Sequence, residues 1–188
     1  GSEMCIRDSY NFVLRGERKN LQTGIDVMRR LTSGKVHLSV RAGSEGEMPA
    51  LQGAEIHKFA GKHPAGNVGV QIHHIDPVNK GEIVWTVNVQ DLAIIGRLFN
   101  DRRVDMRRVV AVAGSEVLKP RYCRIVSGAP VASILRDNVR PQEPGNHCRI
   151  ISGNVLTGVK TPENGYLAFY ANMVTVIPEG DKLSLIHI

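Results

Sequence analysis

The character of the sequence changes near residue 103, and this change constrains the fold more than any other feature. Before it, apolar residues recur at helical spacing in several segments, with short alternating runs between them. After it, short β-rich runs such as RRVVAVAG, RYCRIVSG and NMVTVI are separated by Gly, Pro and Asn. A chain of 188 residues is long enough for two small domains. The sequence therefore predicts one domain over residues 10–103 and a second over residues 104–178.

Helices and short strands alternate in the predicted first domain, which indicates a layered α/β architecture. Helical spacing of apolar residues places them on one buried face, and alternation with polar residues marks the strands. The predicted helices cover residues 17–33, 65–75 and the segment after Asn88, and the predicted strands cover residues 35–40, 54–60 and 82–88. The expected buried helix faces comprise Leu21, Ile25, Met28 and Leu31 in the first helix and Leu92, Ile95 and Phe99 in the last.

The predicted second domain is mainly β. Only the segment PVASILRDN, residues 130–138, has the pattern of a helix. A small sheet with one helix belongs to the α+β class. The predicted fold class of the whole chain is thus α/β followed by α+β.

The composition excludes several functions. A net charge of +6 is compatible with nucleic-acid binding, but aromatic residues make up only 5% and no basic run is interleaved with aromatics for base stacking. The densest basic segment, GRLFNDRRVDMRR, is interpreted as a solvated surface, with a docking face for an acidic partner or anionic lipid as the alternative. No run approaches the ~20 apolar residues that a membrane helix needs. We expect neither nucleic-acid binding nor a direct membrane span.

Cysteine usage argues against disulfides and metal clusters. The three cysteines, Cys5, Cys123 and Cys148, form no CxxC pair. This count and spacing exclude a disulfide framework, an iron–sulfur centre and a cysteine zinc site. We expect small core or near-surface residues in a reduced, cytoplasmic setting.

The stretch GKHPAGNVGVQIHHIDPV, residues 61–78, is the strongest candidate for a functional segment. GKHPAG has the G-x-x-x-x-G spacing of a phosphate loop, but no Lys-Ser/Thr follows it. His63, His73 and His74 lack the spacing of a shared metal site, because adjacent histidines on a helix diverge by about 100°. We therefore predict a turn and helix start, with Pro64 in the first helical turn.

The same turn is predicted to dock against a neighbouring domain or partner protein. Its ligand-proximal residues would be Lys62, His63, Pro64 and Gly66. No catalytic, cofactor-binding or metal-binding constellation is predicted anywhere in the chain.

The two ends do not continue the neighbouring patterns. Residues 1–9, GSEMCIRDS, are interpreted as a non-native flank, and residues 179–188 as a tail whose last residues, LSLIHI, are also non-native. The remaining sequence begins in mid-pattern. We expect it to be an internal fragment of a longer protein.

Four collinear blocks of the sequence resemble one known family. KHPAGNVGVQIHHIDPVN, VWTVNVQDLAIIGRLF, RVVAVAGSEVLKPR and RIISGNVLTG are similar to the A subunit of the bacterial sodium-pumping NADH:quinone reductase, over residues 12–180. The resemblance implies a partial Rossmann-like domain followed by a soluble-ligand-binding β-grasp module, in which a ubiquitin-like sheet wraps one helix. It also implies a cytoplasmic protein that its partner subunits hold at the inner membrane.

The resemblance implies a role without a redox centre in this chain. NADH, flavins, an iron–sulfur cluster and quinone would belong to the whole complex, an NADH:ubiquinone reductase that transports Na⁺. The chain itself would bind no cofactor and would contribute docking or a position near quinone. The alternative is a free-standing β-grasp module that binds a small ligand and has no enzymatic activity.

Overall fold

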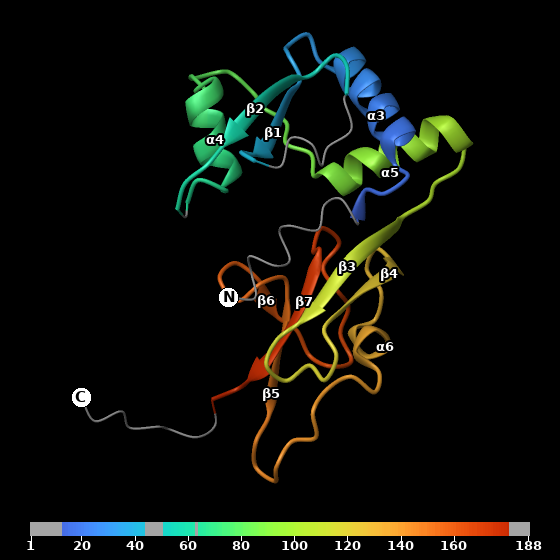
Figure 1. The fold of residues 1–188 in the computed structure, drawn as a ribbon, viewed down its shortest axis with the longest axis vertical. Coiled ribbons are helices and arrows are strands. Elements are labelled where there is room, and N and C mark those ends of the chain that lie inside the picture. Colours follow the sequence, from blue (N-terminus) through green and yellow to red (C-terminus); the bar gives the residue numbers. More distant parts are fainter. Residues whose placement is uncertain (1–12, 44–50, 63, 181–188) are drawn as a thin grey trace, which may run out of the picture. The chain divides into compact units, whose positions relative to one another are not determined.

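The computed structural model describes residues 13–43, 51–62 and 64–180. The predicted flank, Cys5 and His63 therefore lie outside the described residues. The chain divides into two compact units, one ending at Asp105 and one beginning at Met106 (Figure 1). This division lies two residues beyond the boundary predicted from the sequence. Among the described residues, no helix is both long enough and apolar enough to cross a membrane.

Among its described residues, the first unit combines three helices with a two-stranded parallel sheet. In β1 and β2, His37 lies opposite Glu55 and Arg41 lies opposite Phe59. The side chain of Asn88 accepts a hydrogen bond from the Gln90 amide 3.1 Å away and caps the last helix, as expected. The elements are α3 (Arg18–Leu31), β1 (His37–Arg41), β2 (Glu55–Phe59), α4 (Val68–Ile75) and α5 (Val89–Asp101).

Two glycines allow α3 and α5 to lie against each other. A Cβ atom on Gly96 would overlap the carbonyl oxygen of Asn20, and one on Gly24 would lie 2.5 Å from the carbonyl oxygen of Leu92 (Figure 1). The close approach buries the apolar faces of both helices. The resulting core comprises Leu14, Leu21, Ile25, Leu51, Leu92 and Ala93.

The predicted strand over residues 82–88 is wrong. The structure has no regular element there, and the side chains of Ile83 and Trp85 are 80% and 86% exposed. Alternating apolar residues describe one face of a strand, but a strand forms only where a neighbouring strand accepts and donates its backbone hydrogen bonds. The described residues place no such neighbour beside this segment.

Two residues predicted for the helix cores also point outward. Leu31 ends α3 and is 74% exposed, and Phe99 lies near the end of α5 and is 57% exposed. Both fit the helical spacing of the apolar face and lie in the last turn of their helices. In α5 the next residue, Asn100, still donates a hydrogen bond to Asn20 of α3 at 2.8 Å, so the contact between the helices reaches this turn without covering Phe99. Periodicity predicts the apolar face of a helix and does not predict which residues of that face a partner covers.

The described part of the second unit is a mixed five-stranded sheet with one helix. The strand order is β4-β3-β7-β5-β6, in which β3 and β7 are parallel and the other neighbours are antiparallel. A helix within the predicted 130–138 segment is confirmed, as α6. The elements are β3 (Arg107–Ala113), β4 (Arg121–Val126), α6 (Val131–Leu135), β5 (Cys148–Ser152), β6 (Val159–Lys160) and β7 (Met173–Pro178).

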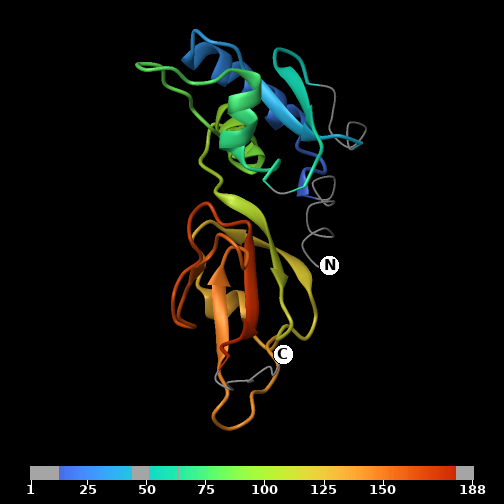
Figure 2. The same ribbon diagram turned by 90° about the vertical axis from the view of Figure 1, so that its left-hand side faces the viewer.

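One face of this sheet packs against α6 (Figure 2). Alternating valines of β3 and β7 reach this face, since residues two apart on a strand point to the same side. The buried cluster includes Val110, Val112, Val131, Ile134, Leu135, Val174 and Val176. Cys123 and Cys148 are free thiols that pack at its margin, as expected for small core or near-surface residues.

The basic segment around the junction is not simply a solvated surface. Arg108 is only 3% exposed, and its Nε donates to the Ser127 hydroxyl oxygen at 2.8 Å. Arg97 donates from Nη1 to the Glu17 carboxylate at 3.1 Å, within the first unit. Arg102 and Arg103, near the end of the first unit, are exposed. Charge density alone could not distinguish the buried, paired arginines from the solvated ones.

Two Gly→Ala substitutions, one at the α3–α5 contact and one away from it, should change stability in opposite directions. Gly96→Ala should lower the free energy of unfolding by about 1–3 kcal/mol, because the new methyl group meets backbone that cannot give way. Gly69→Ala in α4 has open space around the new Cβ and should raise stability by about 0.5–1 kcal/mol. Urea unfolding followed by helical circular dichroism measures both. A Gly96→Ala variant as stable as the wild type would contradict the close helix contact.

The junction predicts the first site of limited proteolysis. Residues 102–106 have no regular structure, whereas Arg107 and Arg108 belong to β3. Brief trypsin treatment should therefore cut after Arg102 or Arg103 and release two fragments that mass spectrometry identifies. An Arg102→Gln/Arg103→Gln variant serves as the control and should lose this early cut. Earlier cleavage after Arg108 in β3 or after Arg149 in β5 in the wild type would contradict the division into two units.

Candidate functional site

The β2–α4 loop, residues 60–67, lies at the carboxyl end of β2. Because β1 and β2 are parallel, their carboxyl ends lie at the same edge of the sheet. In open α/β sheets, ligands and partner groups bind outside the carboxyl ends of the strands. The loop that contains the predicted docking residues therefore occupies the edge that such domains use for binding (Figure 1).

Backbone hydrogen bonds hold this loop in a defined turn. The Ala65 amide donates to the Lys62 carbonyl oxygen at 3.0 Å, and the Asn67 amide donates to the Pro64 carbonyl oxygen at 2.8 Å. Gly61 has a φ of 142°, a region that favours glycine. From α4, the Gln71 side-chain amide donates to the Ala65 carbonyl oxygen at 3.3 Å. The loop is thus preorganised by its own backbone and by the helix that follows it.

The structure exposes the predicted docking residues that it describes. Lys62, Pro64 and Gly66 are all exposed, whereas His63 lies outside the described residues. The prediction that Pro64 begins the helix is wrong, since α4 starts at Val68. Pro64 instead lies inside the turn, where its fixed φ and its carbonyl oxygen shape the chain before the helix begins.

The electrostatics at the start of α4 favour an acidic group. Asn67 precedes the helix, yet its side chain accepts no capping hydrogen bond, and the first turn contains no acidic residue. Amide groups at a helix start carry partial positive charge, to which exposed Lys62 adds a full charge on the adjoining loop. A carboxylate from another protein surface is the chemical group that this arrangement suits best.

The other histidines of the candidate segment lie away from this loop. His73 and His74 belong to the last turn of α4, where cationic side chains suit the negative end of the helix dipole. Both are exposed, and their ring centroids are 5.8 Å apart. They lie at the end of α4 opposite to Lys62.

Several exposed apolar side chains in the same unit were not predicted from the sequence. None of the residues of α4 is buried, and Val68 is 53% exposed. The segment after α4 adds further exposed apolar side chains because it forms no strand. The signal in the sequence, alternating apolar residues, is identical to that of a half-buried strand, so only the structure distinguishes the two. The exposed set includes Ile56, Val68, Val78, Ile83, Val84, Trp85 and Val87.

Two family models match the chain in succession. The first, described as the NqrA second alpha/beta domain, matches residues 6–104. The second, described as the NQRA C-terminal domain, matches residues 109–163. The gap between them contains the junction of the two compact units at residues 105 and 106.

Curated relatives agree with these matches. The A subunit of the Na(+)-translocating NADH-quinone reductase from Neisseria meningitidis serogroup A is 40% identical over 174 residues, which are 92% of this chain and 38% of the relative. Proteins of the same name from Hahella chejuensis and Pasteurella multocida are each 37% identical, over 90% and 89% of this chain and 37% of their own lengths. The chain thus spans less than two fifths of these relatives. Matched over both of its units, the chain belongs to the NqrA family.

Proposed function

We propose that this chain is part of the peripheral NqrA subunit of a sodium-pumping NADH:ubiquinone oxidoreductase. In this complex, NADH oxidation and quinone reduction would drive Na⁺ transport. The observation that carries the proposal is the agreement between the two successive NqrA family matches and the two compact units of the structure. The chain would contribute docking, or a position near quinone, and no redox centre of its own.

The topology supports a β-grasp assignment for the second unit. A ubiquitin-like sheet places its first and last strands side by side and parallel, with a hairpin on each side. Here β3 and β7 are the parallel central pair, β4 pairs with β3, and β5 with β6 completes the sheet. Helix α6 packs on one face through the valine core. The parallel pairing of β1 with β2 beside helices similarly supports a partial Rossmann-like assignment for the first unit.

Cofactors would bind to the whole complex, and the partners of this chain would be the other subunits. NADH, flavins, an iron–sulfur cluster and quinone would be bound in the complex, with no cofactor held by this chain. Attachment to the cytoplasmic side of the inner membrane would then come through other subunits. Protein contacts would replace the solvent that now covers apolar side chains such as Trp85 and Ile83.

The β2–α4 loop is the best candidate for a polar contact in that assembly. It is held by backbone hydrogen bonds, so little conformational entropy is lost when a partner binds. Exposed Lys62 and the uncapped amides of α4 offer positive charge to an acidic group. The exposed apolar side chain of Val68 lies at the start of the same helix. Interfaces between subunits commonly combine charged contacts with apolar ones.

Replacing Lys62 and His63 together by Ala in the full-length protein tests this contact. Folding should be preserved, because Lys62 is exposed and surface substitutions usually change stability by less than about 0.5 kcal/mol. Assembly with the membrane subunits should weaken by at least about 1 kcal/mol, which is a factor of about five in affinity. Co-purification of the subunits and the quinone reductase rate of the membranes measure the effect.

A matched control removes the same two residue types elsewhere on the first unit. The Lys19→Ala/His74→Ala variant changes one exposed residue of α3 and one at the far end of α4. It should assemble and turn over like the wild type. Normal assembly and turnover of the Lys62→Ala/His63→Ala variant would reduce the loop to a structural turn, and equal loss in both variants would show that only net charge matters.

A further inference from the structure

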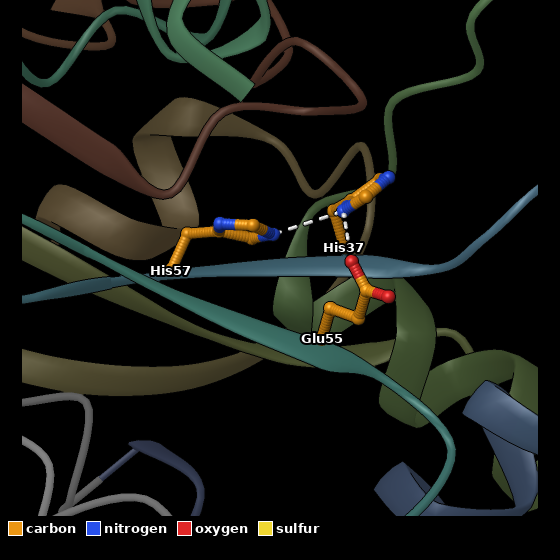
Figure 3. A group of neighbouring side chains, drawn as sticks. All are labelled: His37, Glu55 and His57. Carbon is orange, nitrogen blue, oxygen red and sulfur yellow. Dashed lines mark hydrogen bonds and ion pairs between the residues drawn. The ribbon is translucent and has the colours of Figure 1, made fainter. Parts of the chain in front are cut away.

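Two histidines and a glutamate meet on one face of the small parallel sheet. His37 projects from β1, and Glu55 and His57 project from β2 (Figure 3). One ligand-type atom from each side chain lies within 4.8 Å of the other two. The group lies apart from the β2–α4 loop and belongs to no contact discussed above.

The strand register explains why these three side chains converge. His37 pairs with Glu55, and Ser39 pairs with His57. Residues two apart on a strand share a face, so Glu55 and His57 lie beside His37. The intervening residues Val36 and Leu38 of the β1 segment pack against the apolar core on the opposite face. The core thus holds β1, and pairing with β1 places Glu55 and His57 of β2 beside His37.

The distances place three ligand atoms around one point. His37 Nδ1 lies 2.9 Å from His57 Nε2 and 3.6 Å from Glu55 Oε2. Ligand atoms about 2.0–2.2 Å from a tetrahedral Zn²⁺ are separated by roughly 3.3–3.6 Å. Small side-chain rotations would therefore turn the observed cluster into three corners of a metal coordination sphere. In Figure 3 the second ring nitrogen of each histidine points away from the cluster and leaves the facing nitrogens to act together.

We propose that His37, Glu55 and His57 form a binding site for a divalent first-row transition cation of the Zn²⁺ type. The cation would bridge β1 and β2 through two imidazole nitrogens and one carboxylate oxygen. Two histidines and one carboxylate are a ligand set of mononuclear zinc sites, which keep a further position open for water. Side-chain exposures of 29% for His37 and 48% for Glu55 leave a path for the ion from solvent. The proposal does not depend on the function proposed for the complex.

The contacts of Glu55 leave one of its carboxylate oxygens available to a cation. Lys35 Nζ lies 2.7 Å from Glu55 Oε1. Lys35 occupies Oε1 and leaves Oε2 directed at His37. Two imidazole nitrogens 2.9 Å apart share one N–H proton in the absence of metal, because two facing lone pairs repel. A bound cation would take the place of that proton.

Titration of the 188-residue chain with Zn²⁺ and Co²⁺ tests the proposal. Isothermal calorimetry should give one site with a Kd of about 10 μM or tighter, and Co²⁺ should give the visible absorption of a tetrahedral or five-coordinate site. Mg²⁺ prefers oxygen ligands and should not compete. Binding should also raise the Tm of the first unit, since the cation stabilises only the paired strands.

Substitutions separate this cluster from other imidazoles on the protein. His37→Ala and His57→Ala should each weaken Zn²⁺ binding at least tenfold. Loss of a residue that only hydrogen-bonds to a metal ligand already lowers metal affinity about 10- to 100-fold, and loss of a ligand should cost no less. His73→Ala/His74→Ala removes two exposed histidines of α4 and should leave the affinity unchanged. Circular dichroism establishes that each variant is folded, and His57→Gln replaces His57→Ala if the alanine variant is not.

Lys35→Gln should change the Zn²⁺ affinity in the opposite direction. Lys35 competes with the metal for the charge of Glu55, and exposed ion pairs of this kind are weak. Its removal should therefore strengthen Zn²⁺ binding by about two- to fivefold. A merely structural Lys35–Glu55 pair would show no such gain.

Three results would overturn the proposal. The first is no stoichiometric Zn²⁺ or Co²⁺ binding by the folded wild-type chain. The second is binding that survives the loss of His37 and His57, which would assign it to other groups. The third is Mg²⁺ binding as strong as that of Zn²⁺, which would indicate only a general attraction for cations.

Discussion

Parallel pairing of β1 with β2 is the constraint on which both candidate sites depend. The register that sets His37 opposite Glu55 brings the metal-type side chains onto one face. The same pairing directs the carboxyl end of β2 toward the sheet edge from which the β2–α4 loop leaves. A slip of one residue would turn His37 toward the apolar core and expose Leu38 instead. Half-buried Leu38 and buried Val40 therefore oppose such a slip of β1, whereas Ile56 and Lys58, which pair with them on β2, are exposed.

The two units are stabilised by different packing devices. In the first, glycines at positions 24 and 96 remove side chains where α3 and α5 touch, so backbone atoms approach directly. In the second, valines of β3 and β7 fill the space between the sheet and α6. Buried Arg108 adds polar contacts there, through Ser127 and a cation–π contact with the Phe169 ring at 5.7 Å. Neither device requires the other unit, which agrees with their division near Asp105.

The two proposed sites would serve different purposes in one domain. The β2–α4 loop and the exposed apolar side chains that include Val68 and Trp85 suit a protein surface. The cluster of His37, Glu55 and His57 suits a small cation that bridges adjacent strands. A bridge of this kind would add stability to the described pair of strands, since a two-stranded sheet gains little from its own hydrogen bonds. The exposed loop would then be presented on a more rigid support.

The sequence alone determined the features that depend on residues close together in the chain. Apolar spacing predicted most of the helices, Asn88 marked the start of α5, and the change in texture near residue 103 anticipated two units. The turn around Lys62 and its exposure also followed from Gly and Pro.

Only the tertiary structure decided which alternating run became a strand, since residues 82–88 lack a hydrogen-bonding neighbour among the described residues. It likewise decided that Arg108 is buried and that His37 meets His57 across 20 positions of sequence. Such long-range pairing depends on register, which no local pattern contains.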